Sequence, residues 1–147
     1  MSRPARLLAI GFAVFAFLAI SALLARALTG TGTERAKVIA VVRAEARGDA
    51  GAVLARLPLC RAEPACVATV RRRVAGLRRP GDVKILTYSP SVNVALTRQE
   101  GTGRVAWRAG DGLPVVQCVR VRREGPLTGG GVTLVSVGPP LPGERGC

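Results

Sequence analysis

The chain has 147 residues, a formal net charge of +13 and no histidine, so it is long enough for one ordinary domain and a short appendage. The missing histidine excludes histidine-based triads, and no carboxylates cluster in a catalytic motif, so we expect neither an enzyme nor a metal or cofactor site. Phenylalanine is confined to the apolar N-terminal region, and the single Trp and single Tyr are too few for the stacking platform of a typical single-strand nucleic-acid binder.

The first element is an apolar segment near the N-terminus. After the basic residues 1–6, residues 7–25 contain no charge and are bounded by Arg6 and Arg26. A helix of this length spans about 28 Å, close to the roughly 30 Å hydrocarbon core of a bilayer. We therefore predict an uncleaved transmembrane helix over 7–25, with the membrane as a partner. The alternative is a signal peptide that is cleaved near Ala27, which would release a secreted protein.

Helical patterns follow the apolar segment. Residues 26–33 include TGTGT, which predicts a short flexible linker, and Thr31 with Glu34 fits the capping box of a new helix. Apolar residues at helical spacing, together with Asp49 as a cap and Pro64 in a first turn, predict three helices. These helices cover 34–47, 49–57 and 64–79.

Beyond Pro80 the period of the apolar pattern changes from 3.6 to 2 residues, which is typical of strands. Five strand candidates, separated by turn-forming residues, cover 83–88, 92–98, 104–109, 115–123 and 132–137. Their short connections predict an antiparallel meander. Helices followed by segregated strands predict an α+β domain over 34–137, with about three helices packed on a curved antiparallel sheet of about five strands. The Pro- and Gly-rich residues 138–147 predict a C-terminal strap.

The four cysteines are Cys60, Cys66, Cys118 and Cys147, and all follow the apolar segment. Their spacing fits neither the close pairs of a structural zinc site nor the C-x-x-C of a redox pair. Their even number favours disulfides in an oxidising compartment, and free buried thiols in a cytosolic domain are the alternative. Of the three connectivities, we favour Cys60 with Cys66, a local staple between two helices, and Cys118 with Cys147. Cys118 points away from the valine face of its strand, where the strap can reach it.

The residues ARGDAGAVLARL (46–57) join a long helix to a short one through Gly48-Asp49. With the third helix and the curling meander, this order resembles the nuclear-transport-factor-2-like, or SnoaL-like, cone fold over about 34–137. Catalytic members of that superfamily place His and Asp in the cone, whereas this chain has no His. The resemblance instead implies a scaffold or interaction module like those of single-span bacterial envelope proteins, such as Mce-associated proteins and type IV secretion assembly components.

Together these features predict a single-pass membrane protein with a disulfide-stapled, extracytoplasmic domain that serves as a non-enzymatic interaction or assembly module of the cell envelope. Its partners would be other envelope proteins or, given the positive charge, anionic lipid or polymer, with no nucleic acid expected. One alternative is a cone that binds an apolar or anionic small molecule, with Tyr88 and Trp107 as candidate lining residues, although core packing is the favoured role for each of these two aromatic residues. Another is a cytosol-facing basic domain that binds anionic lipid or nucleic acid. The sequence leaves the oligomeric state open.

Overall fold

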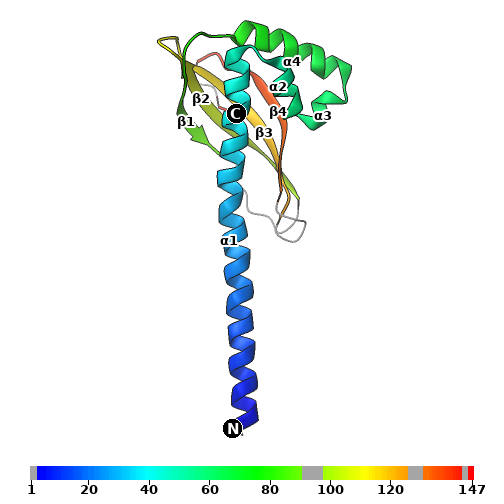
Figure 1. Cartoon of the computed structure of the whole chain (residues 1–147), viewed down its shortest axis with the longest axis vertical. Coiled ribbons are helices and arrows are strands. Elements are labelled where there is room, and N and C mark those ends of the chain that lie inside the picture. Colours follow the sequence, from blue (N-terminus) through cyan, green and yellow to red (C-terminus); the bar gives the residue numbers. More distant parts are fainter. Residues whose placement is uncertain (1–2, 91–97, 126–130, 144–145) are drawn as a thin grey trace.

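The computed structural model describes residues 3–90, 98–125, 131–143 and 146–147, and it shows a helix-and-sheet domain at one end of a long helix (Figure 1). The helices are α1 (Arg3–Arg47), α2 (Ala50–Ala55), α3 (Pro58–Arg61) and α4 (Pro64–Leu77). The strands are β1 (Val83–Ser89), β2 (Gln99–Ala109), β3 (Val115–Arg123) and β4 (Val132–Pro140). They form an antiparallel sheet in the order β1-β2-β3-β4. The predicted α+β class with an N-terminal apolar helix is therefore confirmed.

The strands differ from the predicted ones in their extent. The predicted strand over 92–98 lies outside the described residues apart from Arg98, which precedes β2. β2 begins at Gln99, before the predicted start, because each residue of 99–107 has a partner on β3. The glycines there suggested a turn, but the facing strand supplies the hydrogen-bond partners that overrule this local preference. β4 continues through Pro140, which an edge strand tolerates because proline lacks a backbone donor.

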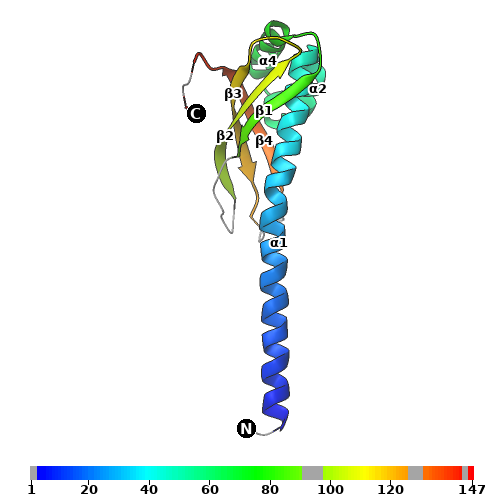
Figure 2. The same cartoon turned by 90° about the vertical axis from the view of Figure 1, so that its left-hand side faces the viewer.

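The flexible linker that was predicted over 26–33 is instead part of α1, which runs without a break through this segment (Figures 1 and 2). A glycine inside a helix costs about 1 kcal/mol relative to alanine, and two glycines do not outweigh helix formation on both sides of them. Residue 31 consequently lies inside the helix and not at its start, and Glu34 is fully buried in the domain. The apolar segment and the domain therefore share one rigid element.

The C-terminal part of α1 forms the centre of the domain core. Its buried residues recur at helical spacing from Glu34 through Val38, Val41 and Val42 to Glu45. Figure 2 shows α1 along one face of the sheet, with the C-terminal segment on the other side. The short helices and α4 cover the rest of the same face, and the core residues Val105, Trp107, Val119 and Val121 point toward them from β2 and β3.

Two local signals at the end of α1 behave as the sequence suggested. Gly48 has φ of +78°, its N–H donates to the carbonyl of Glu45, and the N–H of Asp49 donates to the carbonyl of Ala44. This is a Schellman end, which requires the left-handed conformation that glycine adopts without strain. The Asp49 carboxylate then accepts a 2.8 Å hydrogen bond from the N–H of Ala52 and caps α2. The chain is thereby turned back across α1.

We predict opposite effects for two Gly→Ala substitutions on this helix. At Gly32 a Cβ would meet no atom within 4 Å, so Gly32→Ala should raise the free energy of unfolding by about 0.5–1 kcal/mol. At Gly48 the φ is +78° and a Cβ would lie 3.1 Å from Arg78, so Gly48→Ala should lower it by about 1 kcal/mol or more.

Chemical denaturation of the full chain in detergent, followed by circular dichroism, measures both changes. An unchanged or lowered free energy of unfolding in Gly32→Ala would contradict a continuous α1, because a linker at this position gains nothing from a helix-forming residue.

Candidate functional site

The N-terminal half of α1 exposes its apolar side chains. Pro4–Ala25 is long and apolar enough to cross a membrane, with a mean hydropathy of 2.7, and none of that stretch is buried against the domain. Phe12, for example, is 76% exposed, and it is one of many exposed large apolar side chains in this stretch. The surface of a stable soluble protein rarely exposes so many of them together. Length and composition fit a membrane anchor and also a signal sequence.

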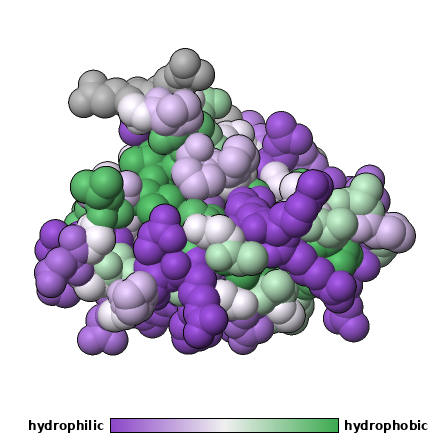
Figure 3. All heavy atoms as spheres, turned by 90° about the horizontal axis from the view of Figure 1, so that it is seen from above, coloured by the Kyte–Doolittle hydropathy of each residue, from purple (hydrophilic) through white to green (hydrophobic). Residues whose placement is uncertain are grey.

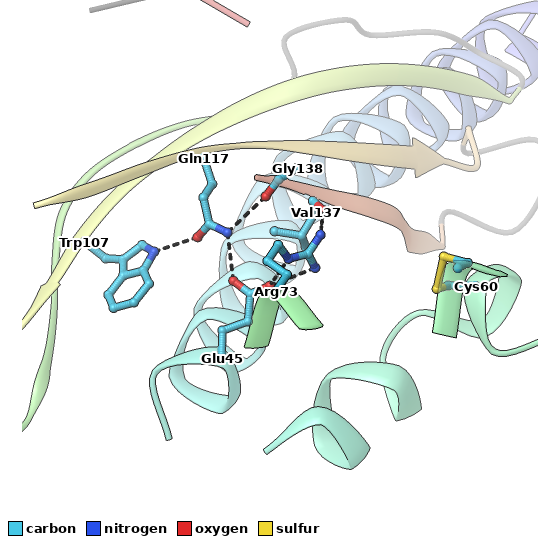
Figure 4. A network of polar contacts seen from close by, with 8 residues as sticks. Glu45, Cys60, Arg73, Trp107, Gln117, Val137 and Gly138 are labelled. Carbon is cyan, nitrogen blue, oxygen red and sulfur yellow. Dashed lines mark hydrogen bonds and ion pairs between the residues drawn. A yellow bond between two sulfur atoms is a disulfide. The ribbon is translucent and has the colours of Figure 1, made fainter. Parts of the chain in front are cut away.

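A polar network crosses the core at the end of the domain that lies farther from residue 3 (Figure 4). Trp107 Nε1 donates to Gln117 Oε1 at 2.7 Å, and Gln117 Nε2 donates to Glu45 Oε2 at 2.9 Å. Arg73 Nε donates to Glu45 Oε1 at 3.0 Å. Glu45, Gln117 and Trp107 are all fully buried. We call these four residues the Glu45 network, and it joins α1, α4, β2 and β3.

The strand β4 closes this network through its carbonyl groups. Gln117 Nε2 also donates to the carbonyl of Gly138 at 3.1 Å, and Arg73 Nη1 donates to the carbonyl of Val137. Burial raises the pKa of the Glu45 carboxyl, and this effect is opposed by the positive charge of Arg73 and by hydrogen bonds from Gln117 and Arg73. Arg73 Nη2 also lies 2.9 Å from Glu45 Oε1 as an ion pair, although it makes no hydrogen bond among the described residues. The network thus links α1, α4, β2, β3 and β4 in one packing arrangement.

A second buried carboxylate lies closer to the apolar segment. The Tyr88 hydroxyl donates to Glu34, and Arg123 Nε donates to Glu34 Oε2 at 2.6 Å. Burial and the neighbouring Glu34 raise the pKa of the Tyr88 phenol, so the hydroxyl remains a donor at all physiological pH values. Glu34 thereby connects α1 to β1 and β3.

Trp107 and Tyr88 pack in the domain, the role that the sequence favours for each of them over the lining of a pocket. Trp107 is fully buried in the core, and Tyr88 is half-buried against Glu34. Neither residue lines any of the described hollows. The inner side of the curved sheet is occupied by α1. Sequence reasoning missed Glu34, Glu45 and Arg73, although the 11-position spacing of the two glutamates, three helical turns, was a usable signal.

The disulfides join Cys60 to Cys66 and Cys118 to Cys147, which are the pairs favoured from the sequence. The first links α3 to the first turn of α4, across a Cα–Cα distance of 5.3 Å. The second links the middle of β3 to the C-terminal segment, on the side of the sheet that faces away from α1. The strap is thus attached to the sheet, and it begins after Pro140 because 138–140 belong to β4.

Two of the three hollows that the described residues form are deep enough to consider as sites. One, of about 600 Å³, lies between α1, the α2–α3 region and β4 and includes Ala36, Lys37, Ala40 and Leu134. Lys37 Nζ donates to the carbonyl of Val132 beside it, so its ammonium group is already engaged. The other, of about 270 Å³, lies between β1 and β2 on the side away from α1. The hydroxyl groups of Thr87 and Ser89 and the guanidinium group of Arg104 line this second hollow.

The surface of the domain is mostly hydrophilic. Figure 3 shows the end of the domain that lies opposite the N-terminal part of α1, where hydrophilic side chains cover much of the view and apolar side chains appear between them in several places. Within the described residues, no group of three or more acidic or cysteine side chains is placed to hold a metal ion. No protein-family model, curated protein or solved structure matches this chain. The functional assignment therefore depends on the geometry of the chain itself.

We predict a specific pH dependence for the Glu45 network. Because burial raises the folded-state pKa of Glu45 above its ordinary 4.5, the folded state holds this proton more tightly than the unfolded state. The stabilising contribution of protonated Glu45 is complete below pH 4.5 and is lost as the pH rises through the folded-state pKa. Glu45→Gln cannot titrate, so wild-type stability minus variant stability should fall as the pH rises from 4 to 7.

Denaturant titrations at several pH values measure this difference, with Glu63→Gln, which removes an exposed carboxyl, as the control for lost charge. A difference that increases with pH would show that Arg73 dominates and that the folded-state pKa is lowered.

We also predict unequal contributions from the two disulfides. In the chain-entropy description, stabilisation grows with the length of the closed loop, and the sequence separations are 6 and 29. Cys60→Ser with Cys66→Ser should cost about 2 kcal/mol, and Cys118→Ser with Cys147→Ser about 3.5 kcal/mol. Non-reducing denaturation curves compare the two double variants. A larger loss from the first pair would mean that the α3–α4 junction depends on its staple for local structure.

Proposed function

We propose that this chain is a single-pass membrane protein with an extracytoplasmic, disulfide-stapled α+β domain that acts as a non-enzymatic interaction or assembly module of the cell envelope. The observation that carries the proposal is the continuity of α1. One helix exposes large apolar side chains over Pro4–Ala25 and buries its later residues in the domain core. A single element is thereby both the membrane segment and the structural centre of the domain.

The continuity of α1 supports an assembly role because it fixes where the domain sits. At 1.5 Å per residue, Glu34 lies about 14 Å beyond Ala25 along α1, and Glu45 lies about 30 Å beyond it. Both glutamates are held by the sheet or by α4, so the domain has a defined height and orientation relative to the apolar segment. A partner then binds a surface that is already positioned, which lowers the entropic cost of association.

The disulfides support a location outside the cytoplasm. Both cysteine pairs are oxidised, and the described residues contain no free cysteine. Structural disulfides form and persist in oxidising compartments, whereas cytosolic thiols are kept reduced. In this proposal the apolar segment is an uncleaved anchor, and residues 1–6 remain on the cytoplasmic side.

The buried ionisable groups support a packing role over a catalytic one. Glu34 and Glu45 are each engaged by an arginine, and the aromatic residues that carry polar atoms donate to them or to Gln117. The resemblance to nuclear-transport-factor-2-like envelope proteins is consistent with a scaffold of this kind. With α1 on the inner face of the sheet, the binding surface for a partner lies elsewhere on the domain.

We predict the orientation from a pair of introduced thiols. Arg72→Cys places a thiol on the exposed side of α4, and Arg6→Cys places one before the apolar segment. A membrane-impermeant maleimide applied to intact cells (or spheroplasts, where an outer membrane is present) should label Arg72→Cys, and it should label Arg6→Cys only after lysis. The mass of the membrane-bound protein should include residues 1–27.

The reverse labelling pattern would eliminate the extracytoplasmic domain. A mature protein that begins near Ala27 and is recovered in the soluble fraction would replace the anchor with a cleaved signal peptide.

A further inference from the structure

The sheet has a second face, which we call the outer face, and it looks away from α1 (Figure 2). Alternation along the strands decides which residues lie on it. On β2 the residues Gly103, Val105, Trp107 and Ala109 are buried toward α1, so the intervening residues are on the outer face. Besides Cys118, whose disulfide holds Cys147 on this side, the described part of the outer face carries five cations. They are Lys84 on β1, Arg104 and Arg108 on β2, and Arg120 and Arg122 on β3.

The register places these cations beside one another without enough carboxylates. Lys84 pairs directly with Arg108 across β1 and β2, and like charges in directly opposed positions destabilise a sheet. Arg122 has a partner, because its Nη2 lies 2.6 Å from Glu100 Oε1. Within the described parts of the chain, Lys84, Arg104, Arg108 and Arg120 form no ion pair. The outer face thus holds an excess of positive charge on rigid strands.

One of these arginines has an unsatisfied donor. The Nε atom of Arg108 is buried and has no hydrogen-bond partner among the described residues. A buried guanidinium donor without an acceptor costs free energy. Arg108 is partly exposed, so its charge can still meet an anionic acceptor on the outer face.

The outer-face hollow offers a specific position for one anionic group. Two cross-strand pairs form it, Thr87 with Ala106 and Ser89 with Arg104. Two hydroxyl groups and one guanidinium group can all donate to a carboxylate, and the methyl group of Ala106 leaves space between them. Arg108 lies four positions along β2, about 13 Å from Arg104 at the rise of an extended strand. The spacing suits an anion with several charged groups along its length.

The position of the outer face argues against the host bilayer as its ligand. Tyr88 on β1 contacts Glu34 and Gln117 on β3 contacts Glu45, so the sheet lies beside the part of α1 that is about 14–30 Å beyond Ala25. Attraction to an anionic lipid surface decays within about 8 Å at physiological ionic strength. The aromatic rings of Tyr88 and Trp107 point inward, so the outer face offers none for stacking nucleic-acid bases.

We propose that the outer face binds an acidic segment of a partner protein, with one carboxylate in the hollow of Thr87, Ser89 and Arg104 and others at Arg108 and Arg120. This inference rests on the proposed function, since it names the partner class of the interaction module. Guanidinium groups suit carboxylates because two parallel N–H donors meet two oxygens. Arg122, already neutralised by Glu100, borders the site.

The test uses the full chain in nanodiscs of zwitterionic lipid and a fluorescent peptide of alternating Glu and Ser. The matched peptide of alternating Gln and Ser should not bind. The triple variant R104Q/R108Q/R120Q should weaken binding of the acidic peptide by about tenfold or more at physiological salt. The control variant R61Q/R71Q/R72Q removes the same charge from the exposed side of α3 and α4 and should weaken binding less than about twofold.

A second variant tests the hollow without changing charge. Thr87→Val with Ser89→Ala removes the two hydroxyl donors and should weaken peptide binding by about threefold or more, with near-ultraviolet circular dichroism of Trp107 showing an intact core. Equal losses in the outer-face and control variants would overturn the proposal, because binding would then follow net charge alone. Inorganic polyphosphate is the second probe. Outer-face-dependent binding of polyphosphate without binding of the peptide would also overturn it.

The failure of this inference differs from the failure of the proposed function. A domain that is labelled in intact cells but does not bind the acidic peptide would refute the outer-face proposal and leave the envelope module standing. A domain that is protected from the reagent would refute the envelope module, whatever the peptide binds.

Discussion

The structure depends on two buried carboxylates on the same side of α1. Glu34 and Glu45 are three helical turns apart, about 16 Å along the axis, and each meets an arginine from a segment distant in sequence, Arg123 on β3 and Arg73 on α4. Leaving one partner of a buried pair without the other costs about 3–5 kcal/mol in proteins generally. A rotation or shift of α1 by one residue would separate both pairs at once. The apolar contacts between them, which would tolerate a slip, are therefore confined to one register.

This arrangement makes the domain and the apolar segment inseparable in structural terms. In many anchored proteins a flexible tether joins a self-sufficient domain to its membrane helix, and the domain samples many orientations. Here the helix that leaves the apolar segment is the helix on which the sheet packs, and its far end is set by Gly48 and the Asp49 cap. Truncation at residue 26 would remove no core residue, whereas truncation within 34–46 would remove the centre of the core.

The parts of the fold that follow from local patterns could be predicted from the sequence, and the parts that depend on distant partners could not. The apolar segment, the Asp49 cap, Pro64 at the start of α4 and β3 itself are readable because their signals lie within a few residues. The continuous α1 was missed because residues 29–33 favour a linker locally. They are helical because the helical segments on both sides of them extend through these residues. The polar partners of the core were also missed, because Gln117 meets Trp107 from another strand and Arg73 meets Glu45 across 28 positions.

The direction of the outer face follows from the strands lying beside α1, not across its end (Figure 2). With α1 along the membrane normal, the outer face looks sideways, parallel to the bilayer plane. A partner anchored in the same membrane would then meet it by lateral diffusion, in two dimensions and at a matched height. A partner arriving from the aqueous side would first meet the turn between β2 and β3 and the end of α4. If α1 crosses a membrane as proposed, this direction favours partners anchored in the same membrane over partners that arrive from solution.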